Sequence, residues 1–137
     1  MTTAEERHLA HRLGALSNDA RRAFSGAVCA AALRRAEVAD APVVDALADV
    51  RSGVGTASRR LAVSAIMNDL DEVAWDLSDR DDHRYSAAFQ RARAVAAVYE
   101  ALGGGDNALF ETVYEAHHAG LALAEIADLL DQLRQPP

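Results

Sequence analysis

The chain contains no lysine, only one cysteine and only seven aromatic residues among its 137 positions. A lone cysteine forms no intrachain disulfide and supplies no cysteine-rich metal site. Cys29 lies in the apolar run of residues 27–32, so we interpret it as a small buried hydrophobic side chain and not as a nucleophile. No uninterrupted apolar run reaches the roughly 18 residues of a membrane helix, and the first residues are acidic, unlike a signal peptide. We therefore expect a cytoplasmic protein without a membrane partner.

Positive charge is also scarce, because 14 arginines face 21 acidic residues and the formal charge is −7. Affinity for nucleic acids comes largely from cations that neutralise phosphates, so we expect no nucleic-acid partner. The exclusive use of arginine, together with 31 alanines, is typical of the codon bias of a high-GC bacterial genome.

The small number of aromatic residues also bears on the fold class. Half of the residues are hydrophobic, and most of these are small aliphatics, which suit closely approaching helices better than sheet faces. No window alternates apolar and polar residues for long enough to predict a strand. A chain of this length fits one domain, which we place over residues 1–137.

Helix start and stop signals divide the chain into six or seven segments. Thr3 and Glu6 have the spacing of a capping box, and Ser17 or Asn18 can cap a second helix. Pro42 suits the first turn of a third helix, which Gly53 interrupts. The glycines at 103–105 and at 120 separate the remaining helices.

The strongest apolar pattern lies in the middle of the chain. Along a predicted helix of about residues 56–78, a first apolar seam with spacings of three and four residues consists of Val63, Ile66, Leu70, Val73 and Leu77. A second, similar seam runs from Tyr85 to Leu102. We expect these two segments to form a hairpin and the helix of residues 56–78 to be central. The sequence thus predicts an all-α fold: a compact bundle of six or seven helices with a central antiparallel helical hairpin.

One candidate metal site lies near the C-terminal end of the chain. Glu111, Glu115 and His118 share one face of a predicted helix, and the Glu-x-x-His spacing is used by di-metal carboxylate bundles. Such a site also needs carboxylates from other helices, for which Glu72 and Glu100 are the candidates. The competing interpretation is a chance pair, with His117 or His118 packed beside Tyr114.

A second candidate is the densest charged stretch, residues 76–84, at the predicted turn of the hairpin. Its aspartates are a candidate interaction site, either for a partner or for a cation: Asp76, Asp79, Asp81 and Asp82. The same residues are also explained as a solvated turn that favours the start of the next helix.

A third group of residues has the chemistry of an anion site. The glycines at 103–105 precede a helix, where backbone amides can hold a phosphate, although Asp106 would repel it and the lysine of a P-loop is missing. Paired arginines at 21–22, 34–35 and 59–60 would form an anion patch only if folding gathered them. No serine or cysteine has the context of an activated nucleophile, so we assign no catalytic residue and no cofactor.

Two segments of the hairpin have a recognisable pattern: residues 70–77, LDEVAWDL, and residues 85–94, YSAAFQRARA. On these segments, residues 66–102 resemble small helical proteins of unassigned function from high-GC bacteria. The resemblance implies action through contact with another protein, and it transfers no catalytic residue.

Three functional hypotheses follow. The first is a non-enzymatic protein that acts through protein contact, as an inhibitor or immunity-type partner of a basic target. The second is a metal-binding carboxylate and histidine bundle protein or enzyme that uses Glu111, Glu115 and His118. The third is a self-assembling scaffold, such as a homodimer, that buries one seam between identical subunits.

Overall fold

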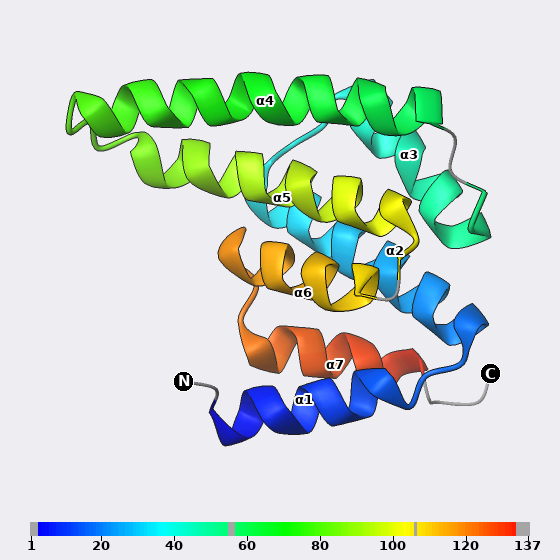
Figure 1. Cartoon of the computed structure of the whole chain (residues 1–137). Helices are drawn as coiled ribbons and strands as arrows, with labels where there is room; N and C mark the ends of the chain where they lie inside the picture. The colour runs from blue at the N-terminus through cyan, green and yellow to red at the C-terminus, as the bar shows by residue number, and fades with distance from the viewer. Residues whose placement is uncertain (1–2, 55–56, 106, 134–137) are drawn as a thin grey trace.

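The computed structural model describes residues 3–54, 57–105 and 107–133, and these ranges contain seven α-helices and no strand. In chain order the helices are α1 (Ala4–Gly14), α2 (Asn18–Ala36), α3 (Ala41–Ser52), α4 (Ala57–Asp79), α5 (Tyr85–Gly103), α6 (Ala108–His118) and α7 (Leu123–Leu133). They form one bundle (Figure 1). The predicted all-α class and bundle architecture are confirmed.

Local side-chain chemistry sets several helix ends where the sequence predicted them. The Thr3 hydroxyl accepts a hydrogen bond from the Glu6 amide at 3.1 Å, and the Ser17 hydroxyl accepts one from the Ala20 amide at 3.2 Å. Helix α3 ends at Gly53, whose φ of 72° lies in the left-handed region that glycine adopts without strain. These ends depend on residues within one turn, which is why sequence patterns find them.

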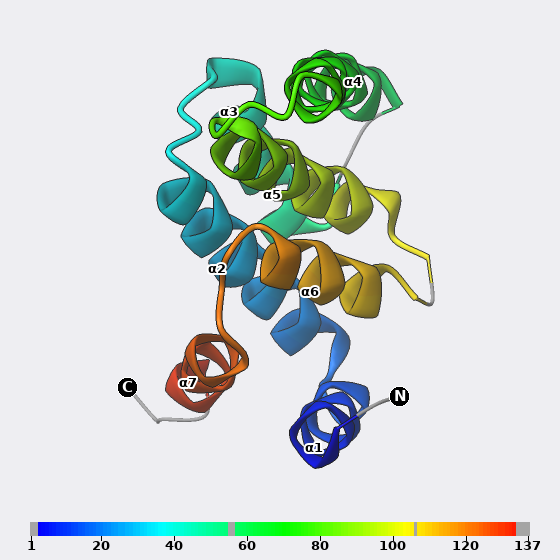
Figure 2. The ribbon, with the colours of Figure 1, turned by 90° about the vertical axis from the view of Figure 1, so that its left-hand side faces the viewer.

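The main core lies around α2 and α5. Phe24 and Val28 of α2 and Val95 and Val98 of α5 are completely buried. Figure 2 shows the layers: α4 covers α5 on one side, α2 and α6 lie on the other, and α1 and α7 are outermost beyond them. Helix α5 packs against α2, α3, α4 and α6, and α2 packs against α3, α5, α6 and α7, so these two helices are enclosed on several sides.

The predicted hairpin is present, and α4 runs antiparallel to α5 (Figure 1). The expectation that the helix of residues 56–78 would itself be central is wrong. Helix α4 packs on α5 and touches α3, and much of its other side faces solvent. Val63 and Leu77 of its seam are buried, whereas Val73 is 51 % exposed. The seam therefore covers the central helix α5 from outside.

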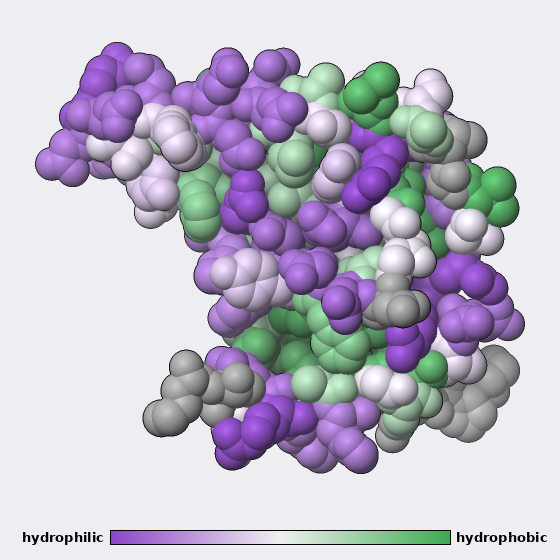
Figure 3. Space-filling model, viewed as in Figure 1, coloured by the Kyte–Doolittle hydropathy of each residue, from purple (hydrophilic) through white to green (hydrophobic). Residues whose placement is uncertain are grey.

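The joined ends of α4 and α5 project beyond the other helices (Figure 1). We call residues 71–89, which form this projection, the α4–α5 arm. The arm has a small core cluster of its own, in which Ala74, Leu77 and Ala88 pack with Tyr85, separate from the main core. It carries six acidic residues and two arginines, and Figure 3 shows that hydrophilic residues cover most of its visible face.

Candidate functional site

The proposed metal ligands on α6 do not converge. Glu111 and His118 are exposed, whereas the Glu115 side chain is only 13 % exposed and accepts a hydrogen bond from Arg93 Nη1 at 2.8 Å. Among the described residues, no group of three or more histidine, cysteine, aspartate and glutamate side chains is placed to hold a metal ion. The metal hypothesis therefore lacks the converging ligands that it requires, and Glu115 has an arginine partner instead.

Arg93 of α5 joins three helices through its ion pairs. Its Nη2 donates to Asp71 Oδ1 of α4 at 2.7 Å, while Nη1 reaches Glu115 of α6. Its Nε is buried without a hydrogen-bond partner, and its guanidinium carbon lies 5.8 Å from the centre of the Phe89 ring. Burial raises the pKa of Glu115, and the charge and hydrogen bond of Arg93 offset part of this rise. The network ties the base of the arm to α6.

The two consecutive histidines point to different partners. The His118 ring contacts Tyr114 edge-on with centroids 4.4 Å apart, and His117 Nδ1 lies 2.7 Å from the Leu121 carbonyl oxygen. Both side chains are exposed. The expectation that one histidine packs beside Tyr114 is confirmed.

The four aspartates of the candidate interaction site lie at and near the tip of the arm. Asp76 pairs with Arg80, and Asp82 accepts hydrogen bonds from both the side chain and the backbone amide of Arg84. These bonds from Arg84 lower the pKa of Asp82. Asp81 turns the chain with a φ of 53°, a conformation that aspartate tolerates. Asp76, Asp79 and Asp81 are exposed, so this end of the arm presents carboxylates to solvent.

The arm also carries an aromatic groove that the sequence patterns did not predict. A cavity of about 660 Å³ lies between α4 and α5, and its aromatic lining consists of Trp75, Tyr85 and Phe89. Trp75 is 75 % exposed, although tryptophan is usually largely buried. The available signal was that Trp75 falls outside the α4 seam and stands between Glu72 and Asp76. Such a position predicts an outward-facing side chain.

Folding gathers one arginine pair with the glycine-rich loop. A second cavity, of about 360 Å³, is bounded by the start of α2, the end of α3, and the residues around the α5–α6 loop. We call it the arginine cavity; its lining includes Arg21, Arg22, Ser25, Asp49, Val50, Leu102, Gly104, Gly105, Ala108 and Leu109. Asp106 of the loop lies outside the described residues. The sequence showed the components, and only the fold brings them together.

Cys29 is completely buried in α2, and burial raises the pKa of its thiol to about 12, with the charge of Arg51 acting in the opposite direction. A protonated thiol without solvent access reacts slowly. We expect the folded protein to resist a thiol-specific reagent, and urea titration to release the thiol in step with unfolding. Labelling that is as fast in native buffer as in strong urea would contradict the structural assignment of Cys29.

No helix among the described residues has both the length and the apolar character needed to cross a membrane. No protein-family model matches the chain, and no curated protein and no solved structure matches it either.

Proposed function

We propose that this protein acts through contact with another protein, and that the α4–α5 arm is its docking surface for a basic partner segment. The observation that carries the proposal is the 75 % exposure of Trp75 within an acidic surface. Tryptophan is enriched among the residues that dominate binding energy at protein interfaces. An exposed tryptophan on a regular helix is therefore a candidate anchor.

The residues one turn away from Trp75 define the chemistry of the partner. Asp71 and Glu72 precede it by four and three residues, and Asp79 follows it by four, so all three carboxylates neighbour the indole on the helix surface. An arginine or lysine of a partner can stack on the indole ring while it pairs with a carboxylate. This combination favours a cationic side chain over an anionic or neutral one.

The groove beside Trp75 supports a partner that is also apolar. Tyr85 and Phe89 continue the aromatic lining toward Arg93, and both side chains are partly exposed. An amphipathic basic helix can place an apolar side chain in such a groove and direct its cations toward the flanking carboxylates. The formal charge of −4 on residues 71–89 would speed the encounter with such a target. Inhibitors and immunity-type proteins of basic targets have this mode of action, and we place the chain in that class.

Trp75→Ala should remove binding and leave the fold almost unchanged, because this side chain buries little surface. The chain has one tryptophan, so its fluorescence reports directly on the proposed contact. We expect an arginine-rich amphipathic peptide to shift the emission of Trp75 to shorter wavelength at low salt, and an acidic peptide of the same apolar pattern to leave it unchanged. In host lysate, a photo-crosslinking residue in place of the exposed Ser78, three residues after Trp75, should capture a basic protein.

Leu61→Ala is the matched control, since Leu61 is 73 % exposed near the opposite end of the same helix. Leu61→Ala should bind the peptide as the wild type does. A crosslinker at position 61 should not capture the basic protein that the crosslinker on the arm captures. Equal effects at positions 61 and 75 would refute the assignment of the arm. Crosslinks from position 78 only to a second copy of the chain would favour the self-assembly hypothesis instead.

A further inference from the structure

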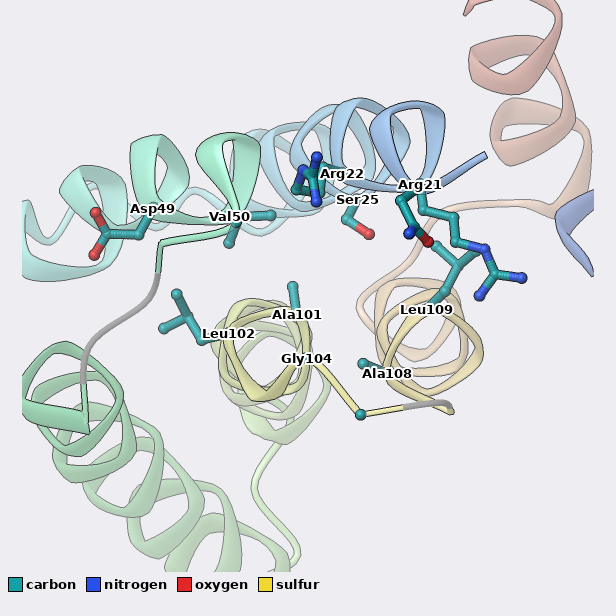
Figure 4. Close-up of a pocket in the computed structure, with 13 residues that line it drawn as sticks. Arg21, Arg22, Ser25, Asp49, Val50, Ala101, Leu102, Gly104, Ala108 and Leu109 are labelled. Carbon is teal, nitrogen blue, oxygen red and sulfur yellow. The ribbon is translucent and has the colours of Figure 1, made fainter. Parts of the chain in front are cut away.

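The arginine cavity lies at the opposite end of α5 from the arm and is independent of the proposed docking surface. Figure 4 shows α2 passing over the ends of α5 and α6, with the cavity between them. Its volume of about 360 Å³ falls in the range of small-molecule sites. Its polar groups and its apolar wall come from different helices, so the site exists only in the folded chain.

Ser25 supplies the observation that points to a ligand. Its side chain lies on the cavity wall and its hydroxyl is directed into the space between α5 and α6 (Figure 4). The residue is only 8 % exposed, and no hydrogen bond to a described residue occupies its hydroxyl. The hydroxyl is not among the buried side-chain atoms that lack a partner, so it is open to the cavity. A hydroxyl on a cavity wall can donate to water or to a ligand oxygen in its place. Ser25 therefore offers the cavity a donor that no protein group occupies.

Two guanidinium groups border the same space. Arg21 donates through Nε to the Leu16 carbonyl oxygen at 3.2 Å and through one Nη to the Gly14 carbonyl oxygen at 3.4 Å. A guanidinium has five N–H groups, so Arg21 retains donors for a ligand while these bonds hold it in place. Arg22 pairs with Asp19, whose side chain is 93 % exposed, and a solvated pair of this kind exchanges partners at little cost.

Two features of the fold favour an anion in the cavity: Gly53 leaves space for Arg22, and Arg59 pairs with the acidic lining residue Asp49. A Cβ atom at Gly53 would come within 2.6 Å of Arg22 Cδ, so the glycine leaves space for this arginine beside the cavity. The carboxylate of Asp49 accepts a hydrogen bond from Arg59 Nε at 2.9 Å. This pairing reduces the repulsion that Asp49 would exert on an anion.

The lining of the cavity continues to the first turn of α6. Ala108 and Leu109 line the cavity, and Asn107 at the helix start makes no side-chain capping bond. A helix start without such a cap leaves amides and the positive end of the helix dipole for an anion. Val50, Leu102 and Leu109 add an apolar wall. The lining thus combines anion-binding groups with a surface for an organic moiety.

We propose that the arginine cavity binds a small organic phosphate. The phosphate group accepts hydrogen bonds from Arg21, Arg22 and Ser25, and the organic part packs against the apolar wall. Phosphate fits better than a monocarboxylate because three donor residues of α2 line the cavity and a phosphate offers three terminal oxygens.

The test is calorimetric titration of the full chain at low ionic strength with AMP, ribose 5-phosphate, inorganic phosphate and adenosine. We expect at least one of the two organic phosphates to bind, inorganic phosphate to bind about tenfold or more weakly than that compound, and adenosine to show no binding. Arg22→Gln should weaken the binding of the organic phosphate about tenfold or more. Arg34→Gln, at the exposed opposite end of α2, is the charge-matched control and should leave it unchanged.

Ser25→Ala separates a binding role from a structural one. It should weaken the binding of the organic phosphate about threefold or more and leave the melting temperature of the free protein almost unchanged, because the hydroxyl makes no hydrogen bond to a described residue. The proposal is overturned if none of the phosphates binds, if adenosine binds as well as AMP, or if Arg22→Gln and Arg34→Gln bind alike. A lower melting temperature with unchanged binding in Ser25→Ala would likewise overturn the role of this hydroxyl.

Discussion

Phe24→Ala is expected to lower the free energy of unfolding by about 3–5 kcal/mol. Phe24 is the largest of the completely buried side chains, and it lies in α2, which packs against α3, α5, α6 and α7. Its truncation removes apolar contacts and leaves a cavity that four neighbouring helices cannot all close at once. Urea unfolding followed by circular dichroism measures the change.

Phe110→Ala provides the matched control, because the same substitution is made at a side chain that is 37 % exposed. We expect this change to cost about 1 kcal/mol or less. Similar losses in the two variants would mean that Phe24 does not belong to the main core. A loss at Phe110 that exceeds the loss at Phe24 would invert the proposed order of burial.

Arg93→Met is expected to lower the free energy of unfolding by about 2 kcal/mol near neutral pH. Breaking a fully buried ion pair costs about 3–5 kcal/mol, and the loss here is smaller because Asp71 and Glu115 keep some contact with solvent. The methionine preserves apolar volume but leaves Glu115, with a side chain 13 % exposed, without its cation. Asp71 is 35 % exposed and is expected to contribute less to the loss. The substitution also releases α4 from α6 at the base of the arm.

The loss in Arg93→Met should diminish as the pH falls. Burial already raises the folded-state pKa of Glu115 above its value in the unfolded chain, and removal of the arginine raises it further. Proton binding to Glu115 therefore stabilises the folded state of the variant. This stabilisation is fully present below the pKa of Glu115 in the unfolded chain, and it is lost as the pH rises through the pKa in the folded state. Unfolding experiments between about pH 8 and about pH 5 should therefore show a shrinking difference from the wild type.

The double variant Arg93→Met with Glu115→Gln is the control for this pH dependence. Without the ionisable group at position 115, the difference from the wild type should lose most of its decrease on acidification. It should also be smaller near neutral pH than in Arg93→Met alone, because no buried charge is left unpaired. A pH dependence that persists unchanged in the double variant would assign the effect to another group.

Much of the candidate chemistry could not be read from spacing along the chain. Glu111, Glu115 and His118 share a helix face, but their neighbours on other helices determine what they do, and Glu115 is bonded to Arg93 of α5. The arginine cavity is the opposite case, because residues that are distant in the sequence line one site. Arg21 and Gly105 are far apart in sequence, and only the crossing of α2 over the α5–α6 loop places them in one cavity.

The amino-acid sequence by itself determined the helices and most of their ends. The capping hydroxyls of Thr3 and Ser17, the glycine at 53 and the three-to-four residue periodicity act within one or two turns, so local physics suffices. Only the tertiary structure decided which apolar seam lies at the centre, because α4 and α5 both carry one. Burial depends on how many helices surround a seam: α5 packs against four others, whereas α4 covers α5 and leaves Trp75 to solvent.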